Sequence, residues 1–393
     1  MRPVAIVGVG MCKFGKYKGS LDDMMVEVAT KALADAKMSE KDADTVYVAN
    51  MGAGAINRQT AIASALIDRL GMVGNTSAVS VENGPASGAN AVKLAAMEVA
   101  SGFANSALVV GAEKMRAAEG SIVTDFVAMM TRPDAEYIHG VTLPSHAAMF
   151  ARLHMAKYNV EPRHLAMVAI KNQNNGLLNP YAHIQQKITM EGILTLPEAK
   201  MNNPYVAEPL RLYDMCPVSD GAAAAVIVPL EDAKKYNDTP VKIAGMGQGT
   251  DLQTVHQRKD PLDLKAVRIA SDNAFKMAKL ERKDMDLLEL HDAFTILEIA
   301  ESEAAGFFKP GTGHKALEEG ITEIGGKLPI NASGGLKARG HPVGATGVAQ
   351  LAELTFQLRG EAGKRQIAKA EKGFAINFGG FGNNVVATIL TRP

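Results

Sequence analysis

Cysteine is nearly absent from this chain of 393 residues, which contains only Cys12 and Cys216. Two cysteines give no disulfide framework and too few thiolates for a zinc site of their own, so we expect no metal site. Neither sign of charge is in excess, because 42 lysines and arginines balance 42 aspartates and glutamates. The sequence therefore has no electrostatic signature of nucleic-acid binding.

Long hydrophobic runs are also missing. The longest, such as residues 222–230, are far shorter than the roughly 20 apolar residues that a membrane-spanning helix needs, so we expect no membrane span. Residues 1–8 lack the apolar core and the small-residue cleavage site of a signal peptide, and are typical of a first buried strand. We therefore expect a cytoplasmic protein.

The chain does have enough apolar sequence for two packed cores, since 47% of its residues are hydrophobic. A weak internal repeat divides it. Residues 3–10 recur as residues 240–247, and residues 36–44 recur as residues 278–286. Each copy of the second segment leads into a short apolar strand, so the repeat predicts a duplicated α/β unit.

We place the first unit at residues 1–235 and the second at residues 236–393. In each unit short β-branched strands alternate with longer helical patterns, which predicts βαβ units on a mostly parallel sheet. Residues 115–209 of the first unit have no counterpart in the second. Their methionine-rich and polar composition predicts helices and a mobile covering loop, of the kind that contacts substrates.

Aligning the two units through their apolar helices pairs two positions. Pro85, in Gly84-Pro85-Ala86-Ser87, lies opposite His341, in Gly340-His341-Pro342-Val343. Both precede a predicted helix, and a helix N-terminus offers unpaired N–H groups and the positive end of its dipole to a developing anion. Two such ends that meet near a pseudo-twofold axis would form a site for an oxyanion.

A second histidine lies at the end of a predicted strand. His291 follows an apolar strand and precedes the amphipathic run at residues 296–304. Such positions are where α/β sheets place ligands. We therefore select His291 and His341, out of nine histidines, as the candidate catalytic residues.

The segment at residues 377–384 joins two predicted strands and is richer in glycine than a tight turn requires. Gly379 and Gly380 within it permit positive φ and close backbone approach, so their N–H groups could form a nest for an anion. Residues 8–13, by contrast, lack the third glycine of a dinucleotide fingerprint. We therefore expect no nicotinamide cofactor.

These segments resemble the thiolase superfamily over essentially the whole chain, and most closely its sterol-carrier-type and archaeal branch. The most specific segment is residues 331–347, which contains Asn-Ala-Ser-Gly-Gly and Gly-His-Pro-Val-Gly-Ala-Thr-Gly. Residues 109–115, 216–224 and 291–294 give weaker support.

The resemblance implies an α/β fold, a five-layer αβαβα sandwich of two similar halves with an inserted loop domain. It implies a coenzyme A thioester as the substrate and no permanently bound cofactor. The residues that it places against the CoA thioester are Gly340, Ser333, Gly334, Gly379 and Gly380. It also implies a homodimer or higher oligomer and, in this branch, a zinc-ribbon and OB-fold partner subunit.

In the family, a cysteine thiolate forms an acyl-enzyme, a histidine acts as its base, and a second cysteine acts as acid and base. By motif, His341 matches that histidine and His291 matches the residue that helps to hold the thioester oxygen. Pro85 stands at the nucleophile position, and Ala293 stands where this branch often carries the second cysteine. Proline also lacks the N–H of an oxyanion hole, a donor typically worth roughly 3 to 4 kcal/mol in the transition state.

Three interpretations follow from this mixture of retained and missing residues. We favour an enzyme that makes or cleaves the carbon–carbon bond beside an acyl-CoA thioester through an enolate, without an acyl-cysteine. Retro-aldol chemistry or direct acyl transfer to CoA would both meet that description. The second interpretation is a thiolase that is active only with a partner subunit, and the third is a non-catalytic CoA-binding scaffold subunit.

Overall fold

In the computed structural model, which describes residues 2–74 and 76–393, a nine-stranded sheet has the order β3-β2-β4-β7-β1-β8-β11-β10-β9. The first unit supplies β1 (Val4–Met11), β2 (Thr45–Ala49), β3 (Ser77–Val81), β4 (Ala107–Lys114) and β7 (Asp220–Pro229). The second supplies β8 (Val241–Thr250), β9 (Leu287–Glu289), β10 (Lys372–Gly379) and β11 (Asn384–Thr391). A small separate sheet contains β5 (Tyr205–Ala207) and β6 (Leu210–Arg211).

The helices divide between the two units and the segment inserted into the first. Those of the first unit are α1 (Leu21–Asp35), α2 (Ala53–Ile56), α3 (Ile62–Leu70), α4 (Ser87–Ser101) and α9 (Ala233–Tyr236). The inserted ones are α5 (Gly120–Ala128), α6 (Leu143–Tyr158), α7 (Pro162–Leu177) and α8 (Ala199–Asn202). The second unit has α10 (Lys265–Ala278), α11 (Thr295–Ala304), α12 (Gly313–Glu318), α13 (Gly335–Ala338) and α14 (Thr346–Arg359).

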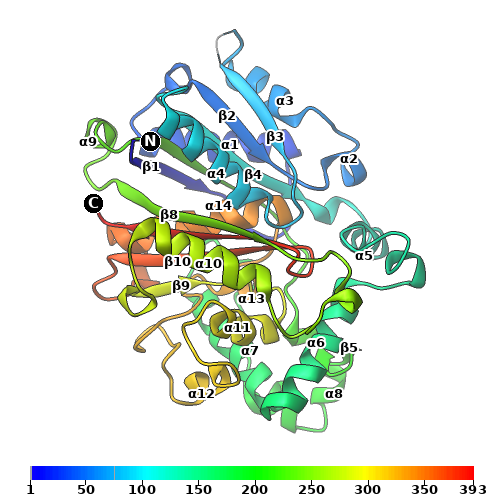
Figure 1. Cartoon of the computed structure of the whole chain (residues 1–393). Helices are drawn as coiled ribbons and strands as arrows, with labels where there is room; N and C mark the ends of the chain where they lie inside the picture. Colours follow the sequence, from blue (N-terminus) through cyan, green and yellow to red (C-terminus); the bar gives the residue numbers. More distant parts are fainter. Residues whose placement is uncertain (1, 75) are drawn as a thin grey trace.

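The helices α4 and α14 form the middle of the molecule. They contact each other, and each contacts strands of both units: α4 reaches β10 and β11, and α14 reaches β4 and β7. On the outside, α1 covers β1 and β7, whereas α10 covers β8 and β11 (Figure 1). The two halves of the sheet join through a short pairing of β1 with β8. The expected αβαβα arrangement is confirmed.

The internal repeat has a packing reason. Its first segment forms β1 in one unit and β8 in the other, and each of these strands lies directly under a helix. A Cβ atom on Gly8 would lie 2.1 Å from the Ala32 carbonyl oxygen of α1, and one on Gly245, the equivalent position of the repeat, would lie 2.2 Å from the Ala274 carbonyl oxygen of α10. Glycine at these positions therefore serves close packing of a helix on a strand.

The expectation of a mostly parallel sheet is wrong. Parallel pairing is found for β2 with β3, β2 with β4, and β9 with β10, whereas β1–β7, β4–β7, β1–β8, β8–β11 and β10–β11 are antiparallel. The chain returns from β10 into β11 through the short glycine-rich turn, and strands joined by a tight turn pair antiparallel. Strand alternation with helices did not reveal this return.

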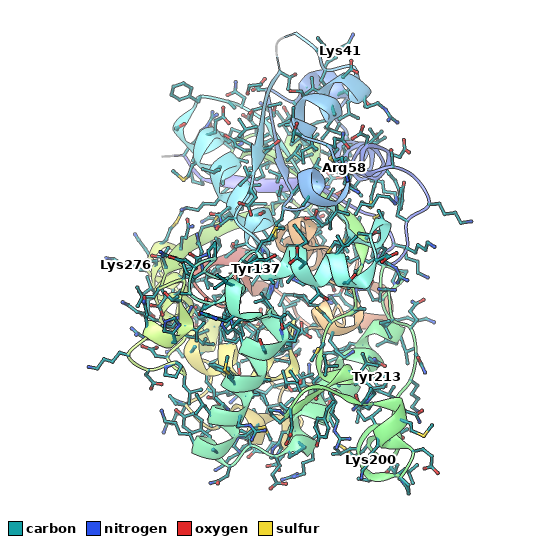
Figure 2. The ribbon with its side chains drawn as sticks, turned by 90° about the vertical axis from the view of Figure 1, so that its right-hand side faces the viewer. Lys41, Arg58, Tyr137, Lys200, Tyr213 and Lys276 are labelled. Carbon is teal, nitrogen blue, oxygen red and sulfur yellow. The ribbon has the colours of Figure 1, made fainter. Side chains whose placement is uncertain are left out.

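The inserted segment is helical, as its composition predicts. Its helix α7 packs against α11, α12 and α13 of the second unit. Figure 2 shows the labelled Tyr137 near the middle of the molecule and Lys200 and Tyr213 toward one end, with Lys41 toward the other. The insertion therefore belongs sequentially to the first unit but lies largely along the second. Its mobility, and the unit boundary at residues 235 and 236, stay predictions.

The apolar interior forms two main clusters. One contains β1, β2, β4 and β7 with the helices around them, and the other contains β9 to β11 with α10, α11 and part of the insertion. Their separation agrees with the expectation of two packed cores. Within residues 2–74 and 76–393, no helix has the combination of length and apolarity that crossing a bilayer requires.

Candidate active site

The structure brings the two candidate histidines together. His341 lies between α13 and the 3₁₀ turn η8 (Val343–Ala345) that leads into α14, and His291 lies between β9 and α11. Their ring centroids are 4.8 Å apart and the ring planes are perpendicular. His291 is 2% exposed and His341 is 9% exposed. A strand end and a helix entry therefore place two imidazoles in direct contact.

Both imidazoles are neutral. Burial, together with the nearby Arg339 guanidinium, lowers the pKa of His341 to about 3. Burial also lowers the pKa of His291 well below its usual value, and His341 and Arg339 add to that effect. A neutral imidazole has one N–H donor and one lone pair, so the position of the proton on each ring decides what it can do.

The hydroxyl of Thr346 decides the position of the proton on His341. Its Oγ1 atom lies 2.6 Å from Nδ1 of His341 and donates to the carbonyl oxygen of Pro342 at 3.1 Å. Because that hydroxyl has a single proton, giving it to Pro342 leaves the oxygen to accept from Nδ1–H of the imidazole. In this arrangement the lone pair of His341 is on Nε2. Thr346 belongs to the most specific sequence segment, but the pattern alone assigned it no role.

His291 is fixed from three sides. Its backbone N–H donates to Oε2 of Glu301 at 2.8 Å, and its ring stacks on Phe378 with a centroid distance of 5.9 Å. Its Nδ1 atom lies 3.5 Å from Nδ2 of Asn377. The Nε2 atoms of His291 and His341 have no hydrogen-bond partner among the described residues, and neither is among the fully buried unpaired nitrogens. Each Nε2 atom therefore keeps some accessible surface.

A buried charged group lies behind the histidines. Arg339 and Glu289 are both fully buried, and Nη1 of Arg339 lies 3.4 Å from Oε2 of Glu289. The hydroxyl of Ser333 donates to the same oxygen at 2.7 Å. Ser333 is therefore occupied by a structural hydrogen bond, and its predicted contact with CoA stays a prediction.

The two glycines predicted to contact CoA in this segment are tightly packed. Gly340 has φ +110°, and a Cβ atom there would lie 2.6 Å from Oγ of Ser219. Gly334 has φ +94°, and a Cβ atom there would lie 2.9 Å from Cα of Gly176 in α7. The left-handed backbone and the lack of space both require glycine. A role in CoA binding stays a prediction for these residues as well.

At the start of α4, where Pro85 lies, the polar groups form hydrogen bonds with one another. Oγ of Ser87 accepts from the N–H of Asn83 at 2.7 Å and donates to the carbonyl oxygen of Gly84 at 2.6 Å. The N–H of Ala86 donates to Asn83 at 3.2 Å, and that of Ser87 donates to Gly84 at 3.1 Å. Pro85 itself has no N–H. These first groups of the helix therefore already have partners and are not free to bind an anion.

The glycine-rich turn of the second unit lies against the residues that flank Pro85. A Cβ atom on Gly379 would lie 3.1 Å from Cβ of Ala86, and one on Gly84 would lie 3.7 Å from the Gly380 nitrogen. Gly380 has φ +58°, and its N–H donates to no described residue. The free N–H supports the predicted nest at Gly379 and Gly380, which stays a prediction. A Cβ atom on Gly84 would also lie 2.9 Å from Sδ of Met130, a residue of the insertion.

Glu113, at the end of β4, connects the loops of the two units. Its buried carboxylate accepts from the N–H groups of Met51 at 3.0 Å, Gly52 at 2.9 Å and Gly344 at 3.0 Å, and from Nδ2 of Asn50 at 2.9 Å. Burial raises the pKa of Glu113 to about 7, while these donors favour its ionised form. Gly344 lies in the turn after His341, so Glu113 helps to hold that turn. The sequence segment around Glu113 indicated the family but not this role.

Neither thiol is activated. Cys12 accepts from the N–H of Ala222 at 3.1 Å inside the first core, and burial raises its pKa to about 11. The backbone of Cys216 donates to the Ala293 carbonyl oxygen at 2.9 Å, and burial, followed by the charge of Asp292, raises the pKa of its thiol to about 12. A nucleophilic cysteine needs a lowered pKa. Residues 2–74 and 76–393 also contain no cluster of three or more metal-ligating side chains.

Comparison with known proteins places this geometry in a family. The model of the thiolase N-terminal domain matches residues 4–231, and the model of the thiolase C-terminal domain matches residues 247–392. An acetyl-CoA acetyltransferase of Methanothermobacter thermautotrophicus is 43% identical over 395 residues, covering 100% of both chains. Sterol carrier protein 2 of Gallus gallus is 33% identical over 99% of this chain and 71% of its own length.

A solved structure described as the Ltp2-ChsH2(DUF35) aldolase has a similar fold. It superposes with a TM-score of 0.84 at 25% identity, over 99% of this chain and 98% of that one. The similarity therefore extends over both units and the insertion, and is not confined to the histidine segments.

Proposed function

Because the chain belongs to the thiolase family, we propose that it makes or cleaves the carbon–carbon bond beside an acyl-CoA thioester through an enolate, without a cysteine acyl-enzyme. The observation that carries the proposal is the contact between His291 and His341. The second unit supplies two neutral imidazoles whose Nε2 atoms have no partner among the described residues. At the equivalent position the first unit has Pro85. That arrangement retains groups able to stabilise and protonate an enolate but supplies no nucleophile.

The roles of the two rings differ in this proposal. His341 carries its lone pair on Nε2 and serves as the base, and His291 donates a hydrogen bond to the thioester oxygen. The low pKa of His341 keeps its lone pair available at neutral pH. Negative charge that develops on the neighbouring substrate favours the protonated ring, so its basicity rises as the reaction proceeds. A preorganised donor at the oxyanion is worth roughly 100-fold to 1000-fold in rate.

A retro-aldol cleavage of a 3-hydroxyacyl-CoA would proceed in two proton transfers. His341 takes the proton of the 3-hydroxyl group, the C2–C3 bond breaks, and its electron pair moves into the thioester as an enolate. An aldehyde or ketone leaves from C3. The protonated His341 then returns the proton to C2, which gives a shortened acyl-CoA and restores the neutral ring. No oxidant and no covalent enzyme intermediate is required.

Direct acyl transfer would use the same groups. The thiol of CoA gives its proton to His341 and attacks the 3-oxo carbonyl of a 3-oxoacyl-CoA. Collapse of the tetrahedral adduct breaks the C2–C3 bond and releases one acyl-CoA and one enolate, which His341 protonates at C2. The aldolase name of the structural relative favours the retro-aldol route, and the acetyltransferase name of the sequence relative favours this one.

A second candidate function is acyl transfer that requires a partner subunit. It is favoured by the acetyltransferase name of the 43% identical relative and by the partner named in the aldolase structure. We propose a zinc-ribbon and OB-fold protein as that partner. We also propose a homodimer that pairs through the edge strand β3, where Val79 is 47% exposed, beside Met97 of α4, which is 51% exposed.

The test is product analysis with purified protein, alone and with the co-expressed partner. The substrates are a 3-hydroxyacyl-CoA, and a 3-oxoacyl-CoA with free CoA; His341→Gln is the control. Aldehyde or ketone release from the first substrate identifies a lyase, and a second acyl-CoA from the other identifies acyl transfer. Thiolysis that appears only with the partner favours the second function. Tight CoA binding with no turnover under either condition overturns both and leaves a scaffold.

A further inference from the structure

Asn377, the last residue but two of β10, connects the first unit to His291. It is buried, and its two amide atoms face different partners. Oδ1 accepts from the backbone N–H of Ala89 in α4 at 3.1 Å, and Nδ2 lies 3.5 Å from Nδ1 of His291. One side chain therefore touches the helix that follows Pro85 and the imidazole of the second unit.

The orientation of this amide is determined by the backbone of α4. A backbone N–H can only donate, so the atom of Asn377 that faces Ala89 must be the oxygen. The NH₂ group then faces His291. Gly347 leaves the space for this arrangement, because a Cβ atom there would lie 2.2 Å from Oδ1 of Asn377. A flipped amide would place NH₂ against the Ala89 N–H and lose both contacts.

The amide orientation selects one tautomer of His291. The NH₂ group of Asn377 can donate to Nδ1 only when Nδ1 carries its lone pair; two facing N–H groups would repel. Asn377 is the one described residue within hydrogen-bond distance of Nδ1 of His291. The other contacts of His291 use its backbone N–H, which donates to Glu301, and its ring face, which Phe378 covers. The contact of 3.5 Å is long, as contacts in empty active sites commonly are before a ligand tightens them.

We propose that Asn377 is a positioning residue that holds His291 in the tautomer with its proton on Nε2, so that the accessible nitrogen of this ring is a hydrogen-bond donor. The proposal deepens the proposed function and rests on it for its catalytic meaning. Thr346 holds His341 in the opposite tautomer, with the lone pair on Nε2. One ring thus offers a proton to the thioester oxygen while the other accepts one, and the first unit contributes through Ala89.

The direct test reads the tautomer without any turnover. Protein labelled with ¹⁵N in its histidines is measured by NMR at neutral pH, and the His291 signals are assigned from their loss in His291→Gln. We expect a protonated Nε2 and an unprotonated Nδ1. Asn377→Asp keeps the shape but replaces the NH₂ donor by an oxygen acceptor, which Nδ1–H would satisfy. We therefore expect this variant to move the proton of His291 to Nδ1.

The matched control is Asn384→Asp, on the same hairpin, whose amide contacts Asn83 and Gln248 instead. It should leave the His291 tautomer unchanged. With the proposed substrates, Asn377→Asp should lower kcat roughly 100-fold, the loss expected when one oxyanion donor becomes an acceptor, with a smaller change in KM. Asn377→Ala removes the amide without adding an acceptor, so it should give a mixture of His291 tautomers. This variant serves as the test if Asn377→Asp does not fold.

Two results would overturn the proposal: a wild-type His291 with its proton on Nδ1, or folded Asn377 variants whose His291 tautomer equals that of the wild type. The NMR result does not depend on turnover. An inactive protein with the expected tautomer shift would therefore refute the proposed function and leave the positioning role intact. An active protein with no shift would do the reverse.

Discussion

The entries of α4 and α14 are equivalent positions of a duplicated unit, yet the two candidate catalytic histidines meet at only one of them. At α14, His341 has a free Nε2 atom and contacts His291, with Arg339 buried behind it. At α4, Pro85 is flanked by backbone groups that are satisfied within their own turn. The same backbone plan thus builds a polar site in one half and a closed turn in the other.

The difference indicates that the two halves have different roles in the candidate site. The first unit supplies positioning contacts to the second: Glu113 accepts from Gly344, and Ala89 donates to Asn377. Glycines allow the two helices to approach, since a Cβ atom on Gly88 would lie 2.8 Å from the Val348 nitrogen. We infer that the second half holds the chemistry and the first half holds it in place.

The largest expected effect comes from removing His341, the proposed base. His341→Gln should lower kcat about 1000-fold, the typical size of a general acid–base contribution, while the fold stays intact because Thr346 is the one hydrogen-bond partner of the ring among the described residues. Steady-state kinetics with circular dichroism as the folding control measure this. A loss below tenfold would contradict the division between the halves.

Removing His291, the proposed hydrogen-bond donor, should lower kcat less than removing His341. His291→Gln is expected to lower kcat about 100-fold, because one oxyanion donor is lost while His341 remains. Competitive inhibition by a CoA thioester checks that substrate still binds. If this variant proved as active as the wild type, the thioester oxygen would have to lie elsewhere.

Breaking the connection between the halves should appear first in stability. Glu113→Gln replaces an acceptor oxygen by an NH₂ group that faces backbone donors, so the free energy of unfolding should fall by about 2 kcal/mol. Chemical denaturation measures this change, with Glu119→Gln as the matched control, because Glu119 is exposed and its side chain makes no capping hydrogen bond. An unchanged midpoint would mean that the two loops hold each other without Glu113.

The first-half entry should tolerate change. Pro85→Ala is expected to alter kcat less than about threefold and the free energy of unfolding by less than about 1 kcal/mol, because proline is well placed before a helix but donates no contact. Parallel assays against His341→Gln give the comparison. A loss as large as that of the histidine variant would make Pro85 part of the chemistry and erase the asymmetry.

The smallest expected effect is on the pH profile at low pH. Because the folded pKa of His341 is about 3, and that of His291 is also lowered, both rings stay neutral between pH 5 and 7. The rate should therefore change less than about twofold over that range. Stability behaves differently: an unfolded histidine binds a proton below pH 6.5 while the folded one does not, so stability falls as the pH drops from 6.5 toward 3. An activity loss centred near pH 6.5 would show a normally titrating histidine.

Sequence patterns predicted the elements of this fold better than their directions. The repeat correctly identified β1 and β8 as equivalent strands, because Gly8 and Gly245 must each admit a helix at close range. The parallel sheet was predicted wrongly, since alternating strands and helices do not show that β7 and β11 run against their neighbours. Pairing direction depends on contacts between segments far apart in the chain.

The site could be predicted in the same partial way. His291 and His341 stand out by local context, at a strand end and in a glycine-dense segment. Thr346, Asn377 and Glu113 do not, because their importance lies in which atom they face across the two units. The resemblance places Ser333 against the CoA thioester but does not show that its hydroxyl donates to the buried Glu289. Hydrogen-bond direction is a property of the folded chain.

The most direct test of a reaction without acyl-enzyme is intact-protein mass spectrometry during turnover. Wild-type protein is quenched while it consumes a 3-oxoacyl-CoA or a 3-hydroxyacyl-CoA, and Pro85→Cys serves as the positive control because it restores a thiol at the α4 entry. We predict product formation with no mass added to the wild-type chain, and an acyl adduct on the variant. An acyl group on Cys12 or Cys216 of the wild type, formed and consumed at the rate of turnover, would contradict the account.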